Sequence, residues 1–428
     1  MEPTYDPTAC PSCKGGRLYR HGVRDQHYVD APHYGEPAVL LVRRRRWRCQ
    51  DCSTLFPDPL PAIDEKRRAT QRLVRYVRGR SLKYTFAEIG REVGLSDRSI
   101  RHIFDDLVRD LETQFEFVTP RYLGIDEVKL IGKYRCILTN VEANTVYDML
   151  ATREMAGLRE YFRRFRNPKA VEVVTADLWN NYAVIAREFF PKALFVADRF
   201  HVQRMATNAV EAVRKAVRRS LTQKRRIQLK DDRFVLLRHG HSLSAEQMTK
   251  LKSWGDQFPL LGAAWEAKER FFACWNTKSR AIAARELDAW AASITGDVRP
   301  YFAELLTAWS RRRDDILNYF DCPVTNAYTE SINRLAKSIN RMGRGYTLEV
   351  VRAKMLYDSN ALEKGTMTRR VAVQVPDDDL GGLGMGKIGY AAPAKSTGRR
   401  RVGYVTELVC MGAHIPTLCD KLESGAFE

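Results

Sequence analysis

The stretch Tyr122-Leu-Gly-Ile-Asp-Glu127 decides the fold predicted for this chain. Its apolar residues are typical of a buried strand, and Asp126 stands where the apolar run closes. The stretch Val173-Val-Thr-Ala-Asp-Leu-Trp179 repeats the pattern and closes on Asp177. A carboxylate at the end of a strand is held by a rigid sheet and can still point into a cleft. We therefore expect both aspartates to serve one site.

A third acid, Glu330, lies in Thr325-Asn-Ala-Tyr-Thr-Glu-Ser-Ile-Asn-Arg-Leu-Ala-Lys337. In a helix, Asn326, Glu330, Asn333 and Lys337 would share one face within roughly 60°. Such a polar stripe is usually a solvated face, but a single acid between two amides is unusual for solvation alone. Three carboxylates can hold two Mg²⁺ (or Mn²⁺) about 4 Å apart, the geometry for in-line attack on a phosphodiester. The three acids therefore predict a two-metal site.

The pattern after residue 120 predicts three closely spaced strands and then alternating helices and strands. The strands are expected at 121–126, 134–141, 145–151, 170–176 and 193–197, with helices at about 154–166 and 180–190. This order describes a mixed sheet of the ribonuclease H type, in which the first and fourth strands lie side by side. Asp126 and Asp177 would then be neighbours although 51 residues separate them.

The chain is strongly basic. Its 428 residues include 71 Lys and Arg against 52 Asp and Glu, a formal net charge of +19. This excess favours a polyanionic partner, because each neutralised phosphate releases counterions; a merely soluble basic protein is the alternative. No run of 18 apolar residues and no secretory signal is seen, so a cytoplasmic protein is expected.

Four of the nine cysteines form two CxxC pairs, Cys10 with Cys13 and Cys49 with Cys52. Two such knuckles complete a tetrahedral Zn²⁺ site. The 35 residues between the pairs exceed the usual spacer of roughly 15–20 and contain alternating, strand-like stretches. We expect a zinc ribbon with an elongated hairpin, and four reduced structural cysteines are the alternative. The basic run Arg43, Arg44, Arg45 and Arg46 is expected to touch phosphate.

Residues 86–107 predict a helix, a turn and a second helix. Gly94 permits the turn, Ser96 is a good N-cap, and Ile100, Ile103 and Leu107 would fill the core side. Asp97, Arg98, Arg101 and His102 would face outward, where a recognition helix contacts base edges. The surrounding residues 66–101 carry eleven basic and three acidic side chains, which favours a DNA-binding helix-turn-helix over an ordinary helical hairpin.

The predicted fold class is α+β multidomain, with a ribonuclease H-like sheet interrupted by a helical insertion. The insertion would contain five of the seven tryptophans, mostly as packing residues, and the basic residues Arg218 and Arg219. The expected domains are a zinc ribbon at 1–60, a helix-turn-helix domain at 61–117, two catalytic parts at 118–203 and 318–364, the insertion at 204–317 and a tail of unknown role at 365–428.

The order of these motifs resembles that of the bacterial insertion-sequence transposases with a DDE site, of the ISL3 group. The resemblance covers about residues 10–360 and implies that Asp126, Asp177 and Glu330 are the catalytic acids. It also implies that the four paired cysteines are zinc ligands. Asp198-Arg-Phe-His201 looks like a D-x-x-H motif, so Asp198 and His201 are expected to support catalysis. The alternative is that Asp198 only caps the helix that follows it. The sequence departs from the family pattern at Ala327, where a glycine is usual, and in its longer tail.

The resemblance implies a transposase that binds the terminal inverted repeats of an insertion sequence and cuts and joins DNA with two Mg²⁺. The partners would be double-stranded DNA and at least one further protomer, in the bacterial nucleoid. The expected DNA contacts are Arg43, Arg44, Arg45, Arg46, Arg98, Arg101, Arg218, Arg219 and Lys337. Two alternatives remain open: a transcription regulator built on the zinc ribbon and helix-turn-helix, and a ribonuclease H-like nuclease that cuts without joining.

Overall fold

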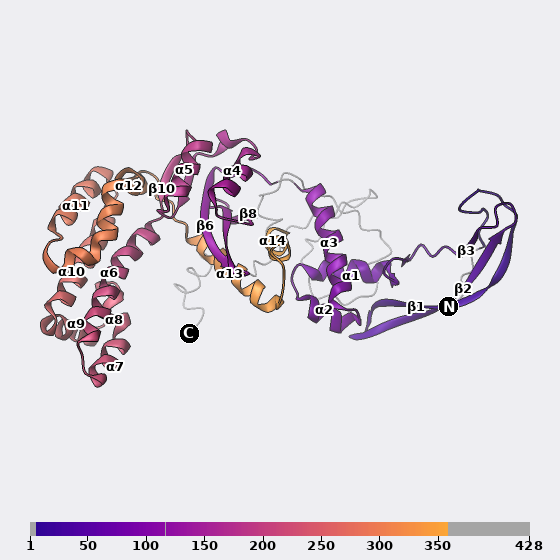
Figure 1. The fold of residues 1–428 in the computed structure, drawn as a ribbon, viewed down its shortest axis with the longest axis horizontal. Coiled ribbons are helices and arrows are strands. Elements are labelled where there is room, and N and C mark those ends of the chain that lie inside the picture. Colours follow the sequence, from indigo (N-terminus) through magenta and orange to yellow (C-terminus); the bar gives the residue numbers. More distant parts are fainter. Residues whose placement is uncertain (1–5, 116, 358–428) are drawn as a thin grey trace, which may run out of the picture. The chain divides into compact units, whose positions relative to one another are not determined.

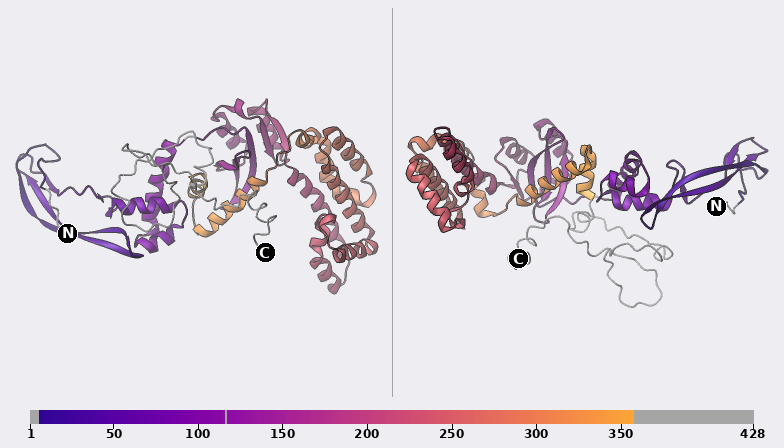
Figure 2. Two further views of the ribbon diagram at one scale, coloured as in Figure 1. Left: turned by 180° about the vertical axis from the view of Figure 1, so that it is seen from behind. Right: turned by 90° about the horizontal axis from the view of Figure 1, so that it is seen from below.

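The computed structural model describes residues 6–115 and 117–357 (Figures 1 and 2). Within these residues the chain forms two compact units. The first unit comprises residues up to 115 together with residues from 338 onward, and the second comprises residues 117–337. The predicted tail at 365–428 lies outside the described residues. No described helix is both long and apolar enough to cross a membrane.

The first unit begins with a long two-stranded hairpin. Strands β1 (Leu18–His33) and β2 (Glu36–Cys49) pair antiparallel, and short strands extend the sheet in the order β3-β2-β1-β5-β4. Tyr34 and Gly35 join the two long strands with φ angles of 49° and 84°, the left-handed pair that a tight two-residue turn requires. The hairpin occupies most of the long spacer between the cysteine pairs. The short strands are β3 (Leu55–Pro57), β4 (Ile63–Asp64) and β5 (Ala69–Thr70).

Four helices complete the first unit: α1 (Gln71–Ser81), α2 (Phe86–Val93), α3 (Asp97–Gln114) and α14 (Leu348–Tyr357). Gly94 ends α2 in the left-handed conformation, and the Ser96 side chain caps α3, as predicted. Ile100 and Ile103 are buried; Phe104 is also buried, whereas Leu107 is only half-buried. The connection between α2 and α3 is therefore a tight, capped turn.

Helix α14 is tied to the first unit by a buried lysine. Lys354 is 4 % exposed, and its Nζ donates to the carbonyl oxygens of Ser81, Leu82 and Tyr84 at the end of α1. A lysine at a helix C-terminus satisfies carbonyls that have no partner within the helix. Residues 338–357 belong to the first unit, so the described residues of the predicted second catalytic part, 318–364, are divided between the two units.

A five-stranded mixed sheet forms the centre of the second unit, in the order β10-β9-β6-β7-β8. Strands β6, β7 and β8 are antiparallel neighbours, whereas β9 and β10 run parallel to β6. The predicted first and fourth strands, β6 and β9, are indeed hydrogen-bonded neighbours. The bounds are β6 (Tyr122–Leu130), β7 (Lys133–Asn140), β8 (Thr145–Leu150), β9 (Val173–Ala176) and β10 (Leu194–Ala197).

Helices α4 (Met155–Arg163) and α5 (Asn180–Phe189) pack their apolar residues against the sheet in one core. Strand β6 continues four residues past Asp126, so the prediction that a strand ends at this acid is wrong. The reason is that β7 pairs with β6 along its whole length. The parallel neighbour β9 does end beside Asp126, which leaves one side of β6 open there.

A helical layer with its own core follows β10 (Figure 1). Its first helix starts at Arg199 and its last ends at Asp321, so both extend beyond the predicted insertion of 204–317. Four of its five tryptophans are buried and the fifth, Trp265, is partly buried, which confirms their packing role. The helices are α6 (Arg199–Arg219), α7 (Gln223–Asp231), α8 (Arg233–Leu237), α9 (Ala245–Gln257), α10 (Pro259–Ala273), α11 (Arg280–Ser293) and α12 (Ala303–Asp321).

Helix α13 (Ala327–Gly343) docks on β6 through polar groups. Asn326, just before the helix, donates to the Ile125 carbonyl oxygen at 3.0 Å, and the hydroxyls of Thr139 and Thr329 share a hydrogen bond of 2.7 Å. Gly124 makes this close approach possible. A Cβ atom there would lie 2.4 Å from Thr139 Oγ1 and 2.7 Å from Asn326 Oδ1. The polar stripe, predicted to be a solvated face or a metal-binding face, is thus partly a docking face.

Gly124→Ala is expected to lower the free energy of unfolding of the second unit by about 1–3 kcal/mol, because the added methyl group overpacks the helix–strand contact. Urea unfolding followed by circular dichroism measures the change. Gly79→Ala is the matched control, since a Cβ at this position in α1 meets open space. Equal stability of the Gly124 variant and the wild type would contradict the packing described above.

Candidate active site and zinc centre

The sheet brings two of the predicted acids to one place. Ile125 of β6 pairs with Ala176 of β9 in parallel register, so Asp126 and Asp177 follow at the next position on adjacent strands. The Asp126 carboxylate is buried, and Asp177 is half-buried with its Oδ1 accepting a hydrogen bond from the Trp179 amide at 2.9 Å. Both side chains are therefore held by short-range contacts.

The third acid is carried by the helix that docks on the same strand. Asn333 donates from Nδ2 to Asp126 Oδ2 at 2.8 Å and to the Glu127 carbonyl oxygen at 3.2 Å. Glu330 lies three residues before Asn333, hence on the same face of α13. The side chain of Glu330 is half-buried. The amide contacts of α13 thus fix the position of this third carboxylate relative to Asp126.

The acids influence one another electrostatically. Burial, together with the charges of Asp177, Asp198 and Glu330, raises the pKa of Asp126 to about 7, although the charge of His201 acts in the opposite direction. Burial also raises the pKa of Asp177 and of Glu330 above their ordinary values. Crowded, partly desolvated carboxylates of this kind disfavour their charged forms unless a cation neutralises them.

Asp198 and His201 are hydrogen-bonded to each other, and their charges act on the three acids. Asp198 is fully buried; its Oδ2 accepts from His201 Nδ1 at 2.7 Å, and its Oδ1 accepts from the Phe200 and Asn326 amides at 3.3 Å. Burial alone would lower the pKa of His201. The hydrogen bond to Asp198 and the negative charge of Asp198 together have the larger, opposite effect, so the pKa of His201 is raised. Asp198 was predicted as a catalytic residue, but a carboxylate with no exposure can act only through its neighbours.

Glu127, the acid next to Asp126, points elsewhere. Its carboxylate pairs with Arg153, whose guanidinium also lies over the rings of Tyr134 and Trp179, at 4.1 and 4.9 Å from their centres. Successive side chains of a strand point to opposite faces of the sheet. Glu127 accordingly contacts Arg153 on one face, while Asp126 contacts Asn333 on the other. Glu127 therefore lies outside the acid cluster.

Two of the polar residues that organise the acids were not assigned that role from the sequence. Asn326 and Asn333 were noticed as amides flanking Glu330, but their spacing could not show that they bind strand β6. Arg204, one turn after His201 in α6, was also missed; its charge lowers the pKa of Asp177 and of Glu330 against the effect of burial. Its position three residues after His201 is the only sequence signal that could have indicated it.

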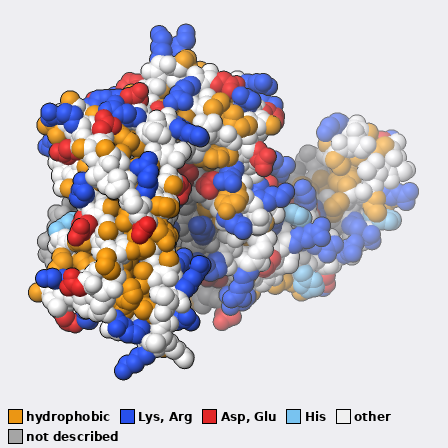
Figure 3. Space-filling view, turned by 60° about the vertical axis from the view of Figure 1, so that its left-hand side comes forward, with side chains coloured by type: hydrophobic (Ala, Val, Ile, Leu, Met, Phe, Trp, Pro, Cys, Tyr) orange, Lys and Arg blue, Asp and Glu red, His pale blue; other side chains and the backbone are white. Residues whose placement is uncertain are grey.

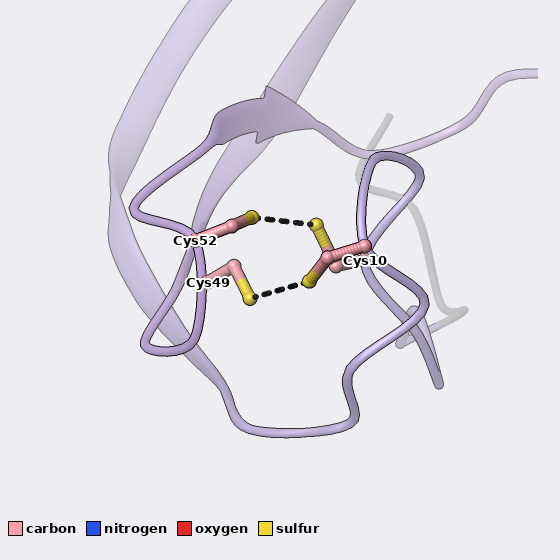
Figure 4. Close-up of side chains that lie close together, drawn as sticks. Cys10, Cys49 and Cys52 are labelled. Carbon is pink, nitrogen blue, oxygen red and sulfur yellow. Dashed lines mark hydrogen bonds between the residues drawn. The ribbon is translucent and has the colours of Figure 1, made fainter.

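The four paired cysteines lie together at the base of the hairpin (Figure 4). The sulfur atoms of Cys10 and Cys52 are 3.6 Å apart, as are those of Cys13 and Cys49, and all four lie within 4.8 Å of one another. Tetrahedral Zn–S bonds of about 2.3 Å place sulfur atoms about 3.8 Å apart. The arrangement therefore fits a structural zinc ion.

Of the groups with metal-binding side chains in residues 6–115 and 117–357, this one alone has all its ligand atoms within 4.8 Å. The acids Asp126, Asp177 and Glu330 do not form such a compact group.

The structure revises the predicted phosphate contacts of the hairpin. Arg44 is buried and donates to the Asp58 carbonyl oxygen and, at 3.0 Å, to Glu65; Arg45 pairs with Asp58 at 3.0 Å. The prediction that Arg44 contacts phosphate is therefore wrong, and Arg45 is committed to Asp58 and Asp6. The basic run alternates between the two faces of a strand, so only part of it can reach solvent.

The remaining predicted contact residues lie at or near the surface. Arg43, Arg98, Arg219 and Lys337 are exposed, whereas Arg46, Arg101 and Arg218 are half-buried. Arg101 pairs with Asp105 at 2.7 Å. The face drawn in Figure 3 shows many more Lys and Arg side chains than Asp and Glu side chains, in keeping with the net charge.

Comparisons with known proteins find matches for the cysteine-containing segment and for the segment that contains the three acids. Residues 123–355 match the DDE family of the ISL3 group, described as a transposase, and residues 6–52 match the zinc-finger of transposase IS204/IS1001/IS1096/IS1165. The chain therefore belongs to the ISL3 group of DDE transposases.

Individual relatives agree with this assignment. The transposase for insertion sequence element IS1001 of Bordetella parapertussis is 22 % identical over 356 residues, which cover 81 % of this chain and 87 % of the relative. The transposase for insertion sequence element IS1557 of Mycobacterium tuberculosis (strain ATCC 25618 / H37Rv) is 24 % identical over 277 residues, 58 % of this chain and 62 % of the relative. The predicted zinc ribbon and transposase function are thereby confirmed.

Metal analysis of the purified protein should find roughly one Zn²⁺ per chain. Cys49→Ser should release the ion and abolish amide protection in β1 and β2 while the second unit remains folded, because zinc binding and folding of such ribbons are coupled. Cys322→Ser, outside the cluster, is the control and should retain zinc. Full zinc content in the Cys49 variant would exclude this ligand set.

The raised pKa of Asp126 predicts a pH-dependent stability. The protonated carboxyl is favoured in the folded state, so its stabilisation is complete below about pH 4 and is lost as the pH rises through about 7. Without added divalent metal, Asp126→Asn should therefore be more stable than the wild type at pH 8, by up to about 4 kcal/mol, with the difference vanishing near pH 4. Thermal unfolding at both pH values tests this, and a variant no more stable at pH 8 would contradict it.

Proposed function

We propose that this transposase cuts and joins the DNA ends of an insertion sequence at the site formed by Asp126, Asp177 and Glu330. The observation that carries the proposal is the docking of α13 on β6 through Asn326 and Asn333, next to the β6–β9 pair. This contact supports a site shared by three carboxylates from segments 51 and 153 residues apart. Family membership supports this role for the site.

The finer fold assignments belong to the same proposal. The order β10-β9-β6-β7-β8, with antiparallel β6–β7–β8 and parallel β9 and β10, supports a ribonuclease H-like catalytic domain. The capped turn between α2 and α3 supports a helix-turn-helix, with Arg98 and His102 on its exposed face. On this proposal the zinc ribbon and helix-turn-helix bind the terminal inverted repeats, and two or more protomers pair two DNA ends.

The residues present fit two Mg²⁺ or Mn²⁺ ions. Carboxylate oxygens are the ligands that these hard cations prefer. Burial raises the pKa of all three acids, and a bound cation would favour their charged forms. The Asn333 Oδ1 atom is buried without a hydrogen-bond partner among the described residues, which leaves a further oxygen free beside Asp126. When bound there, the metals would activate a water or 3′-hydroxyl nucleophile and stabilise the leaving oxygen.

The protein groups have separable roles in this scheme. Asn333 orients Asp126 by donating to one carboxylate oxygen, and the Trp179 amide orients Asp177. Asp198 holds the imidazole of His201 and the chain at Asn326, which makes it a positioning residue. His201, half-buried and near the acids, is the group that can exchange a proton or a hydrogen bond with the substrate.

Asp126→Asn, Asp177→Asn and Glu330→Gln should each abolish Mg²⁺-dependent cleavage and strand transfer, a loss of at least about 10³-fold, because each removes a charge needed to hold the metals. Gel assays on labelled transposon-end DNA measure both steps, and gel-shift assays should show unchanged end binding. Glu127→Gln is the matched control, since its partner is Arg153, and it should retain activity.

An active Glu330→Gln enzyme would refute the assignment of the third acid. Zinc-dependent DNA binding with no cleavage by the wild type would favour a transcription regulator. Cleavage without joining would favour a ribonuclease H-like nuclease. The three outcomes are separated in one reaction series.

A further inference from the structure

A cleft of about 960 Å³ lies entirely within the first unit. It is formed by one side of α2, the beginning of α3, the end of α13 and the turn that follows α13. We call it the arginine cleft, because five arginines line it: Arg91, Arg98, Arg101, Arg341 and Arg344. The lining also includes two carboxylates, those of Glu88 and Asp97, so positive charge predominates.

The turn on one side of the cleft has an unusual backbone. Arg344 has φ +43° and Gly345 has φ +119°, and a Cβ atom on Gly343 would lie 2.1 Å from the ring of Tyr346. Tyr346 is buried, and its hydroxyl accepts a hydrogen bond of 3.0 Å from the Phe86 amide at the beginning of α2. Tyr346 therefore anchors the turn to the helix that forms the opposite part of the cleft.

Arg344 has a disfavoured backbone conformation, and its side chain is not buried in return. The left-handed region is disfavoured for a residue with a side chain, and such outliers persist where surrounding contacts determine them. Arg344 is exposed and its neighbour Met342 is 58 % exposed, so neither contributes a buried side chain. The turn presents a cationic group at a fixed place, which is a property expected of a ligand-binding turn.

The arginines differ in how far they are already engaged. Arg101 pairs with Asp105, and Arg91 donates to a helix carbonyl oxygen at 3.3 Å. Arg98, Arg341 and Arg344 are exposed and form no ion pair with any residue that the structure describes. Of the two carboxylates, Glu88 is occupied by the capping box of α2. Three guanidinium groups, one on α3 and two at the end of α13 and the turn after it, thus remain available to an anion.

The chemistry of the cleft favours a nucleic acid over a protein partner. Protein interfaces depend on buried aromatic or aliphatic anchors at their centre, and the only exposed large apolar side chain that lines the cleft is Met342. A guanidinium group, in contrast, matches phosphate oxygens with two parallel hydrogen bonds. The beginning of α3, with the exposed residues Asp97 and Arg98, also lines the arginine cleft.

We propose that the arginine cleft binds the sugar-phosphate backbone of duplex DNA, with Arg341 at the end of α13 and Arg344 in the turn after it as a second contact beside α2 and α3. This inference rests on the proposed DNA-binding function and adds to it a segment that follows the third acid in the chain. Contacts to phosphate are independent of sequence, so they should hold and orient the duplex without selecting it.

The test is the salt dependence of DNA binding by the full-length protein. Fluorescence anisotropy with a short, labelled duplex of random sequence gives the dissociation constant at several salt concentrations. Arg341→Gln/Arg344→Gln should weaken binding roughly tenfold or more at low salt and should lower the slope of log K against log salt by about 2, since two phosphate contacts are lost. An unchanged affinity or an unchanged slope would overturn the proposal.

A matched control removes the same charge elsewhere in the same unit. Arg78→Gln/Arg109→Gln acts on arginines that pair with Asp110 and Asp106 and that do not line the cleft. Its slope should stay close to that of the wild type. A control that weakens binding as much as the cleft variant would show only a general effect of net charge and would overturn the proposal.

A third variant separates binding from folding. Arg344→Gly keeps the left-handed turn, because glycine adopts that conformation freely, and should leave the melting temperature unchanged or higher while the slope falls by about 1. Retained binding by this stable variant would contradict the role of Arg344. Absence of metal-dependent cleavage in the wild type would instead count against the proposed function, because the cleft is judged by binding alone.

Discussion

The geometry of the second unit depends on one contact, the polar docking of α13 on β6. Helices usually cover a sheet with apolar side chains, but here a threonine pair and two asparagines bind strand groups directly. Such a contact is sensitive to distance, because an amide that moves by an ångström loses its hydrogen bond. It therefore holds Glu330 near Asp126 more precisely than an apolar contact of the same area would. Gly124 is the residue that lets the helix approach closely enough.

The same contact explains why buried charge is tolerated. Asp126 and Asp198 are nearly inaccessible, yet each accepts hydrogen bonds from amide groups, which offset part of the desolvation of a carboxylate. The raised pKa of Asp126 shows that the compensation is incomplete. Burying several acids close together thus lowers the free energy of unfolding, a loss of stability that is common at functional sites.

The sequence was informative where a local pattern sets the structure. Apolar runs predicted where the strands lie along the chain. Gly94 and Ser96 predicted the turn between two helices, and the paired cysteines predicted the zinc ribbon. It was less informative where distant residues decide. Strand β6 continues past Asp126 because of its pairing with β7, Arg44 is buried because Asp58 folds back on it, and Asn333 faces β6 because of how α13 docks. Asp58 is 14 residues from Arg44, and Asp126 is 207 residues from Asn333, so no local spacing could reveal these two contacts. The β6–β7 pairing is a local hairpin, but its extent depends on hydrogen bonds between the strands and not on the apolar run alone.

The buried Lys354 links the completion of the first unit to the synthesis of the second. The carbonyl oxygens that it satisfies belong to residues as far as 273 positions earlier in the chain. At about 5–20 residues per second, a ribosome takes roughly 14–55 s to make that intervening length. During this interval the nascent chain has its hairpin and first three helices but not the turn and helix that complete them. The finished first unit therefore exists only in molecules that already carry all three acids.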